Sequence, residues 1–363
     1  MFKTPILAAA FAVFGLSAAP AEYQESAFWQ SDVDAGSLPP VAERVPEAPK
    51  TVDLKLRNRE LGQQGGTLRT MVTRSKDVRQ MVVYGYARLV GFNERYELVA
   101  DILKSIENED DKKFTMHLRP GHKWSDGHPF TSEDFRYWWE DVANNELLSP
   151  SGPVDSLRVE GELPKVSFPD AHTVIYEWSK PNPQFLQMLA EARPPFIYRP
   201  SHYLKPYHAA YTDEEELRER LYEARVRSWA ALHNRQDNMY KFDNPDLPTL
   251  QPWMMATKDG KSRFLFVRNP YYHRVDANGV QLPYIDVVEM QVVAPGLVAA
   301  KANAGEVDLQ ARGLDFKDAA ILKKGEASGG YQTKRGGNGP ASTSRIYPTP
   351  THNQEEWGED HGR

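Results

Sequence analysis

The sequence contains ten histidines and 50 aspartates and glutamates, which are the side chains that could bind a metal ion or transfer a proton. The most closely spaced histidines are His117, His122 and His128. Their spacing matches no zinc motif, so they leave a metal site open without predicting one. Acid–base catalysis needs two carboxylates that the fold brings together, and the sequence alone selects no such pair. We therefore predict no catalytic residue, no metal ligand and no cofactor.

Other kinds of chemistry are excluded by what the sequence lacks. It has no cysteine, which excludes disulfides, thiolate metal sites and cysteine nucleophiles. It has no His-Glu-x-x-His, no Gly-x-Ser-x-Gly and no Gly-x-x-x-x-Gly-Lys-Ser/Thr phosphate loop. The net charge of −6 does not favour a nucleic-acid partner. The eight Trp and 17 Tyr are instead typical of a protein that grips a small ligand with large flat side chains.

The first 21 residues are predicted to be a signal peptide. Lys3 supplies a positive charge, residues 5–17 form an apolar run, and Ala19 and Ala21 are small residues at the positions that a signal peptidase reads. We predict cleavage after Ala21. The apolar run is too short for a membrane span, and no later run approaches 18 apolar residues. The sequence thus predicts an exported, soluble, periplasmic protein.

Beyond the signal peptide, the periodicity of apolar residues predicts a mixture of strands and helices. Residues 22–64 are rich in proline and small or acidic residues and should form an extended arm. Residues 81–92 are mainly apolar, and their class stays ambiguous between helix and coil. Short strands are predicted at residues 67–73, 114–118, 174–178, 264–267 and 287–293.

Helices are predicted where capping residues precede a 3.6-residue period. Thr131 and Asp134 form a capping box ahead of one helix, and Thr212 and Glu215 form another ahead of a long charged helix over residues 212–233. Further helices are predicted at residues 299–310, running into a short strand at 307–309, and at 317–324. From residue 326 onward glycine and proline dominate, and no packed element is expected.

Several short segments combine turn-forming residues with aromatic residues. In the first, Asp126 is expected to cap a turn through its carboxylate, and Gly127 to supply a positive φ. The others end or begin strands and helices. The segments are LRPGHKWSDG at 118–127, TSED at 131–134, RNPYY at 268–272, LPYID at 282–286 and AGEVD at 304–308.

Taken in order, these segments resemble the bacterial extracellular solute-binding proteins of family 5, the oligopeptide-, dipeptide- and nickel-binding subunits of ATP-driven (ABC) importers. The resemblance runs over about 260 residues, from Gly65 to Gly325. It implies an α/β fold with mixed sheets and two lobes, of the periplasmic-binding-protein kind, type II, large peptide-binding subclass. The lobes would close on a ligand and then dock on an inner-membrane permease.

The resemblance also implies a domain division and a site. The first lobe, with an inserted subdomain, would span residues 65–289, the start of the second lobe 290–325, and an irregular tail 326–363. Because members of this family usually exceed 450 residues, the second lobe is expected to be incomplete. The ligand contacts that the resemblance implies in the first lobe are Thr73, Arg74, Tyr84, Tyr198 and Trp253.

The predicted function is therefore ligand binding without catalysis, by a monomer whose partners are a small solute, expected to be a peptide, and a permease. Two other classes stay open. One is a degenerate or truncated binding protein with a chaperone-like role or no role in transport. The other is a secreted glycan-active hydrolase, which would also be acidic and rich in aromatic residues. The sequence does not decide between a peptide, a nickel chelate and a sugar as the ligand.

Overall fold

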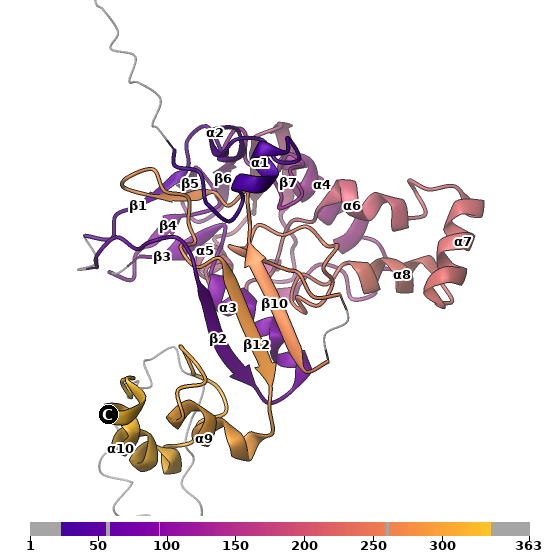
Figure 1. Cartoon of the computed structure of the whole chain (residues 1–363). Helices are drawn as coiled ribbons and strands as arrows, with labels where there is room; N and C mark the ends of the chain where they lie inside the picture. Colours follow the sequence, from indigo (N-terminus) through magenta and orange to yellow (C-terminus); the bar gives the residue numbers. More distant parts are fainter. Residues whose placement is uncertain (1–22, 56–58, 94, 259–260, 335–363) are drawn as a thin grey trace, which may run out of the picture.

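The computed structural model describes residues 23–55, 59–93, 95–258 and 261–334, and the predicted signal peptide lies outside this described part. The fold is α/β with mixed sheets, as predicted (Figure 1). Two sheets have four strands and two have two strands. The strands are β1 Lys50–Val52, β2 Thr67–Val72, β3 Val90–Phe92, β4 Leu98–Ala100, β5 Ser105–Glu109, β6 Lys113–His117, β7 Lys165–Asp170, β8 Thr173–Glu177, β9 Trp253–Met255, β10 Arg263–Arg268, β11 Arg274–Asp276 and β12 Val287–Val292.

The central sheet joins segments that are far apart in the sequence. Its strand order is β2-β12-β10-β9, with β2 parallel to β12 and the other neighbours antiparallel. Thr67 lies opposite Val287, so residues more than 200 positions apart are hydrogen-bonded neighbours. Alternate side chains of β10 and β12, including Phe266 and Met290, are buried in the main core. The strands predicted at residues 67–73, 264–267 and 287–293 are confirmed, each to within one residue.

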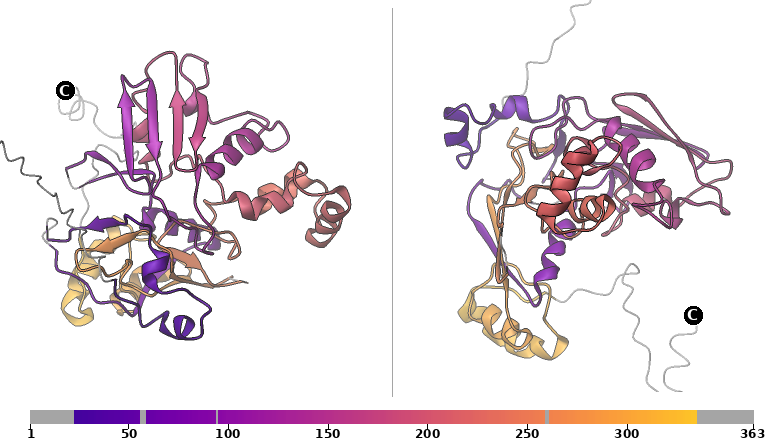
Figure 2. Two further views of the ribbon diagram at one scale, coloured as in Figure 1. Left: turned by 90° about the horizontal axis from the view of Figure 1, so that it is seen from above. Right: turned by 90° about the vertical axis from the view of Figure 1, so that its right-hand side faces the viewer.

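The second large sheet is a separate antiparallel layer with the strand order β5-β6-β8-β7. Figure 2 shows it projecting away from the central sheet. The strands predicted at residues 114–118 and 174–178 are β6 and β8. The capping box is also confirmed: Thr131 accepts a hydrogen bond from the Glu133 amide at 3.3 Å, and Asp134 accepts one from the Thr131 amide at 3.0 Å.

Ten short α-helices connect and cover these sheets. A π-helical segment, Tyr137–Ala143, continues α4 and begins with three consecutive aromatic residues, Tyr137, Trp138 and Trp139. The helices are α1 Gln30–Asp34, α2 Val41–Arg44, α3 Gln80–Gly85, α4 Ser132–Arg136, α5 Phe185–Leu189, α6 Ser201–Leu204, α7 Glu214–Ala224, α8 Trp229–Gln236, α9 Val298–Asn303 and α10 Ala319–Gly329 within the described residues.

The prediction of a single helix over residues 212–233 is wrong, because this part of the chain forms two helices, α7 and α8. Arg225 has a left-handed conformation with φ of 53°, which ends α7, and the Ser228 side chain caps α8 by accepting from the Ala231 amide. The cap of α7 is also one residue further along than predicted. Asp213, not Thr212, accepts a hydrogen bond from the Glu216 amide, at 2.9 Å.

The corrected cap makes a direct prediction. Replacing Asp213 with Ala should lower the free energy of unfolding by about 1 kcal/mol, because an amide at the start of α7 loses its acceptor. Replacing Glu215, the residue of the predicted capping box, should change it by less than about 0.5 kcal/mol. Urea denaturation of the two variants measures the difference. Equal losses would mean that Asp213 does not cap the helix.

The N-terminal arm and the segment around α10, near the two ends of the described part, are more structured than predicted. The arm contains α1 and α2, and its strand β1 pairs in parallel with β11, so it is not a simple extended segment. Near the other end, no strand forms at residues 307–309, but α10 continues past residue 326 to Gly329. The Tyr331 hydroxyl then donates to the carbonyl of Leu322 at 2.7 Å. The segment after 326 is therefore packed as far as Tyr331, because this aromatic ring has a place beside α9 and α10.

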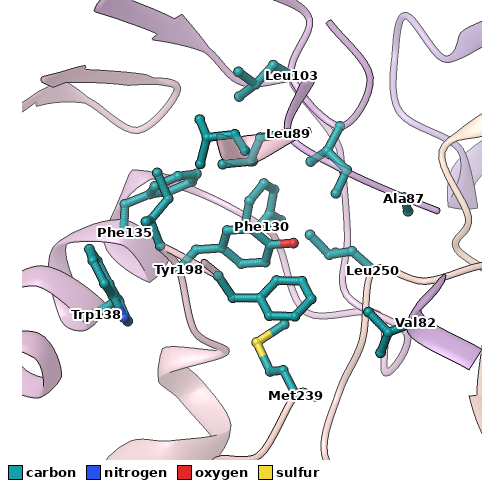
Figure 3. Packing of buried hydrophobic residues seen from close by; sticks show 14 of the residues in the cluster. Val82, Ala87, Leu89, Leu103, Phe130, Phe135, Trp138, Tyr198, Met239 and Leu250 are labelled. Carbon is teal, nitrogen blue, oxygen red and sulfur yellow. The ribbon is translucent and has the colours of Figure 1, made fainter. Parts of the chain in front are cut away.

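The main core lies between the sheets and is strongly aromatic (Figure 3). Phe130, Phe135 and Tyr198 contact one another with ring centroids 5.3–5.6 Å apart. Trp124 is fully buried beside them and donates from Nε1 to Asp134 at 3.1 Å. Within the described residues, three of the Trp and four of the Tyr side chains are thus buried parts of this core.

The helices α9 and α10 form a small unit below the central sheet, with its own core of Met71, Val298, Ala302 and Leu322 (Figure 1). Side chains from residues 308–310 hold the segment before α10 against β2. Arg69 donates to Asp308 from its amide, its Nε and its Nη2, at 2.8, 3.0 and 2.8 Å. Gln310 accepts from the Met71 amide at 2.9 Å and donates to the Met71 carbonyl at 3.0 Å.

Candidate functional site

The five predicted ligand contacts fall into three places. Thr73 and Arg74 follow the carboxyl end of β2, where the chain turns toward α3. Arg74 is exposed, and its guanidinium donates to both carboxylate oxygens of the buried Asp77 at 3.1 Å. The Thr73 methyl group lies beside Gly313, close enough that a Cβ on that glycine would approach it to 3.2 Å. Thr73 therefore faces the segment between α9 and α10, whereas Arg74 pairs with Asp77.

Tyr84 and Trp253 come together at a second place, in the wall of one cavity of about 340 Å³. This cavity, which we call the arm cavity, is covered on one side by the N-terminal arm. Its walls are aliphatic and aromatic, with one formally charged side chain. The lining residues are Val52, Leu54, Tyr84, Gly85, Pro252, Trp253, Tyr272, Arg274, Leu282, Pro283, Tyr284 and Ile285.

Strand pairing and a close helix contact position the two aromatic residues. Trp253 begins β9, lies opposite Arg268 of β10, and donates from Nε1 to the Ile285 carbonyl at 3.0 Å. Tyr84 lies in the last turn of α3, and burial raises the pKa of its hydroxyl, against the opposing charge of Arg312. The next residue, Gly85, packs directly on Pro252: a Cβ there would come within 2.8 Å of the Pro252 Cδ atom. Glycine at this position lets α3 approach β9.

Arg274 is the charged residue of the arm cavity, and it belongs to a buried network around Asp101. The Arg274 Nε donates to Asp101 at 2.8 Å, and Nη2 donates to the same carboxylate. The His273 Nε2 atom lies 3.0 Å from the Asp101 carboxylate, and the Arg88 amide donates to the same carboxylate at 3.0 Å. Burial raises the pKa of Asp101, but Arg274 and His273 more than offset this and hold the pKa well below its usual range. Asp101 is therefore ionised and fixes the orientation of Arg274.

The sequence analysis missed Arg274 and the other walls of the cavity. Arg274 begins the short strand β11 in a stretch that carries no motif, and its contacts to Asp101 and Tyr86 span more than 170 residues. The sequence offered one indication of Arg274. It lies between Arg268–Tyr272 and Leu282–Asp286, two of the segments that carried the family resemblance.

Tyr198 lies in the third place, within the aromatic core. Only 2% of it is exposed, and it packs among Phe130, Phe135 and Trp124. Burial raises the pKa of its hydroxyl well above the usual range. A bound solute could not reach this side chain without opening the core, so the prediction that Tyr198 contacts the ligand is not supported by the structure.

The three histidines considered for a metal site point in different directions. His117 pairs with Glu107, with Nε2 3.0 Å from the carboxylate. His122 is buried beside His273, with ring centroids 5.1 Å apart. His128 stacks on His202 at 3.8 Å. Over residues 23–334, leaving out the undescribed gaps, no three His, Asp or Glu side chains converge in a way that could hold a metal ion.

Comparison with known families identifies the class of this protein. Residues 97–343 match the model described as bacterial extracellular solute-binding proteins, family 5 Middle. This match covers more than half of the chain, so the chain belongs to that family, as its sequence segments indicated.

Individual relatives are binding proteins for different solutes. A solved oligopeptide-binding protein OppA is 33% identical with a TM-score of 0.76, covering 86% of this chain and 49% of that chain. The periplasmic binding protein MelB from Agrobacterium fabrum C58, solved with stachyose, is 25% identical with a TM-score of 0.66, covering 84% of this chain and 46% of that chain. The periplasmic alpha-galactoside-binding protein of Rhizobium meliloti (strain 1021) is 28% identical over 311 residues, which is 79% of this chain and 42% of that protein.

The chain thus spans about half the length of the relatives that it matches. Among its described residues, no helix has both the length and the apolar character needed to cross a bilayer.

Proposed function

We propose that this chain is a periplasmic solute-binding protein of an ABC importer, or the corresponding part of one, and that its solute is an oligopeptide. The observation that carries the proposal is its similarity to OppA, with 33% identity and a TM-score of 0.76 over 86% of the chain. The proposal includes export with cleavage after Ala21, a monomeric state, delivery of the solute to an inner-membrane permease, and no catalysis. A ligand that stabilises a closed state of such a protein does so by its higher affinity for that state.

The proposed domain division follows the predicted one. Residues 65–289 would form the first lobe, with residues 105–177, which include the antiparallel sheet, as part of its inserted subdomain, and residues 290–325 would begin the second. The fold supports a boundary close to residue 290, because β12 ends at Val292 and the chain then enters the separate core around Val298 and Leu322. Within the first lobe, Thr73, Arg74, Tyr84 and Trp253 are the proposed ligand contacts.

A second candidate solute is an α-galactoside. Two observations favour it. The alpha-galactoside-binding protein aligns with 79% of this chain, and the similar protein MelB was solved with stachyose. Aromatic faces such as those of Tyr84 and Trp253 can stack against a sugar ring as well as against a peptide side chain.

Binding measurements separate the two solutes. Isothermal titration with a tripeptide mixture and, separately, with stachyose should give heat of binding with the peptides only. In the Trp253→Ala variant the peptide affinity should fall about tenfold, because a Trp in the wall of a cavity contributes more than most contact residues. Trp229→Ala is the matched control, since Trp229 lies on α8 and not in the arm cavity. Binding of stachyose alone would replace the peptide by the sugar, and equal affinities of the two Trp variants would remove Trp253 from the site.

A further inference from the structure

The arm cavity combines an apolar lining with a single guanidinium group. Eleven of its twelve lining residues carry no formal charge, and the exception is Arg274. The Arg274 side chain is 21% exposed, so it is partly accessible from the cavity although it is held on Asp101. Asp101 pairs with this guanidinium from one side only, and a partly buried cation is stabilised further when a second anion approaches it, which makes Arg274 informative about what the cavity binds.

The hydrogen bonds of Arg274 leave one side of the guanidinium available. Its Nε and Nη2 donate to Asp101, and Nη2 also donates to the Tyr86 carbonyl at 2.9 Å. Within the described residues, no hydrogen bond is recorded from Nη1, and Nη1 is not among the fully buried atoms that lack a partner. The two N–H groups of Nη1 are therefore on the accessible side of the group. Asp101 holds them in a fixed direction.

Three further cationic side chains, those of Arg88, Arg119 and Lys50, interact with Asp101. The Arg88 guanidinium donates to four backbone carbonyls and to no carboxylate of the described residues, and Arg119 likewise donates only to carbonyls. Lys50 lies 3.8 Å from Asp101. Together with Arg274, four cationic side chains therefore surround the one carboxylate of Asp101.

The other carboxylates near the cavity, those of Asp53, Asp276 and Asp286, do not pair with Arg274 in the described structure. Asp276 accepts from the Tyr284 hydroxyl at 2.6 Å and from the amides of Asn278 and Val280 at 2.8 and 2.9 Å. Asp286 pairs with Arg268 at 3.1 Å. In a partly buried site the charge of Arg274 is weakly screened, so an anion that approaches Nη1 is attracted to it.

We propose that the arm cavity binds the carboxylate of a ligand whose adjoining atoms are apolar, with Nη1 of Arg274 donating to the carboxylate and Trp253, Tyr84 and Tyr284 contacting the apolar part. The inference rests on the proposed function, because it names the chemical group that the solute presents to this lobe. The carboxylate could come from the carboxyl terminus of a peptide or from a free organic acid. A neutral oligosaccharide has no such group.

The test compares matched probes on the full chain. The probes are the tripeptide Ala-Ala-Phe with a free carboxyl terminus, the same peptide with a carboxamide terminus, and 3-phenylpropanoate as a free organic acid. Quenching of tryptophan fluorescence and isothermal titration give the affinities. We expect the acid form of the peptide to bind about tenfold or more tightly than the amide, as for other hydrogen bonds to charged groups.

Four variants identify the group responsible. Arg274→Gln should abolish the preference for the acid, and Arg274→Lys should keep part of it. Because Arg274→Gln leaves Asp101 buried without its main partner, the double variant Asp101→Asn/Arg274→Gln removes both charges and provides a folded alternative with the same expected loss. Arg263→Gln is the matched control, since Arg263 pairs with Glu289 on the exposed face of β10. It should retain the full preference.

The outcomes distinguish this inference from the proposed function. A preference for the acid that disappears in the double variant and persists in Arg263→Gln supports the inference, and competition by 3-phenylpropanoate would mean that a free acid suffices. Equal binding of acid and amide overturns the inference and leaves peptide binding intact. A persisting preference in the double variant also overturns it. Binding of stachyose without any binding of peptides overturns both.

Discussion

Replacing Asp101 with Ala is expected to lower the free energy of unfolding by about 3–5 kcal/mol, the usual cost of removing one partner from a buried ion pair. The carboxylate is 2% exposed and accepts hydrogen bonds from Arg274 and from the Arg88 amide. Without it, Arg274 would retain its positive charge in a partly buried site with no opposite charge. His273, β11, β1 and the arm should then lose their common anchor, because all of them meet at this residue or its hydrogen-bonded neighbours.

Denaturant titration monitored by circular dichroism measures this loss. Asp155→Ala is the matched control, because its side chain is fully exposed and lies 3.9 Å from its only ion-pair partner among the described residues, Arg158. That substitution should change stability by less than about 0.5 kcal/mol. A loss below about 1 kcal/mol for Asp101→Ala would mean that the network contributes little, whatever its geometry.

The second large effect is a loss of stability in mild acid. Burial lowers the pKa of His233 and of His273 to about 4, although a neighbouring aspartate opposes the shift in each case. Burial also lowers the pKa of His122 and His208. Between about pH 6.5 and pH 4 the unfolded chain therefore binds protons that the folded protein does not bind. Unfolding becomes more favourable as the pH falls through this window.

The expected size follows from linkage. For a histidine whose pKa falls from about 6.5 to about 4, the free energy of unfolding should be about 2 kcal/mol lower at pH 5 than at pH 7.5. His233 and His273 together should thus contribute about 4 kcal/mol. The depressed pKa values of Asp101, Asp126 and Glu133 act in the same direction, but mainly below the pH at which free carboxylates titrate.

Urea denaturation at the two pH values checks the total, and a substitution assigns part of it. The His233 Nε2 lies 2.8 Å from the Tyr137 hydroxyl. In His233→Gln the carboxamide can still hydrogen-bond but cannot titrate, so the change in the free energy of unfolding between pH 7.5 and pH 5 should shrink by about 2 kcal/mol. His172→Gln, at a half-buried turn outside the core, should leave the pH dependence as it is. Stability that is equal at pH 5 and pH 7.5 would contradict the burial of neutral histidines in the folded protein.

Local chemistry was the part of the fold that the sequence predicted well. The Thr131–Asp134 capping box, the positive φ of Gly127 and the alternating strands β6 and β8 each depend on a few consecutive residues. The break between α7 and α8 was missed for a related reason. The charged residues of α7 form i,i+4 pairs, as expected for a continuous helix. No local feature of the sequence predicts that Arg225 adopts a left-handed conformation and ends the helix.

The candidate site was harder to predict because it is assembled from distant segments. Val52, Tyr84, Trp253 and Arg274 reach the arm cavity from four parts of the chain. Residue type alone also could not separate Tyr198 from Tyr84, since both are tyrosines in apolar segments. Only the packing of Phe130 and Phe135 decides that Tyr198 belongs to the core.

The contacts of Asp308 and Gln310 with β2 have a consequence for self-association. β2 is one of the two edge strands of the central sheet, and an edge strand offers unpaired peptide groups on which another molecule can add a strand. The carboxamide of Gln310 already occupies both the amide and the carbonyl of Met71, as a neighbouring peptide group would. An incoming strand must first displace this side chain and the Arg69–Asp308 pair. The central sheet is thereby protected against growth into intermolecular aggregates along β2.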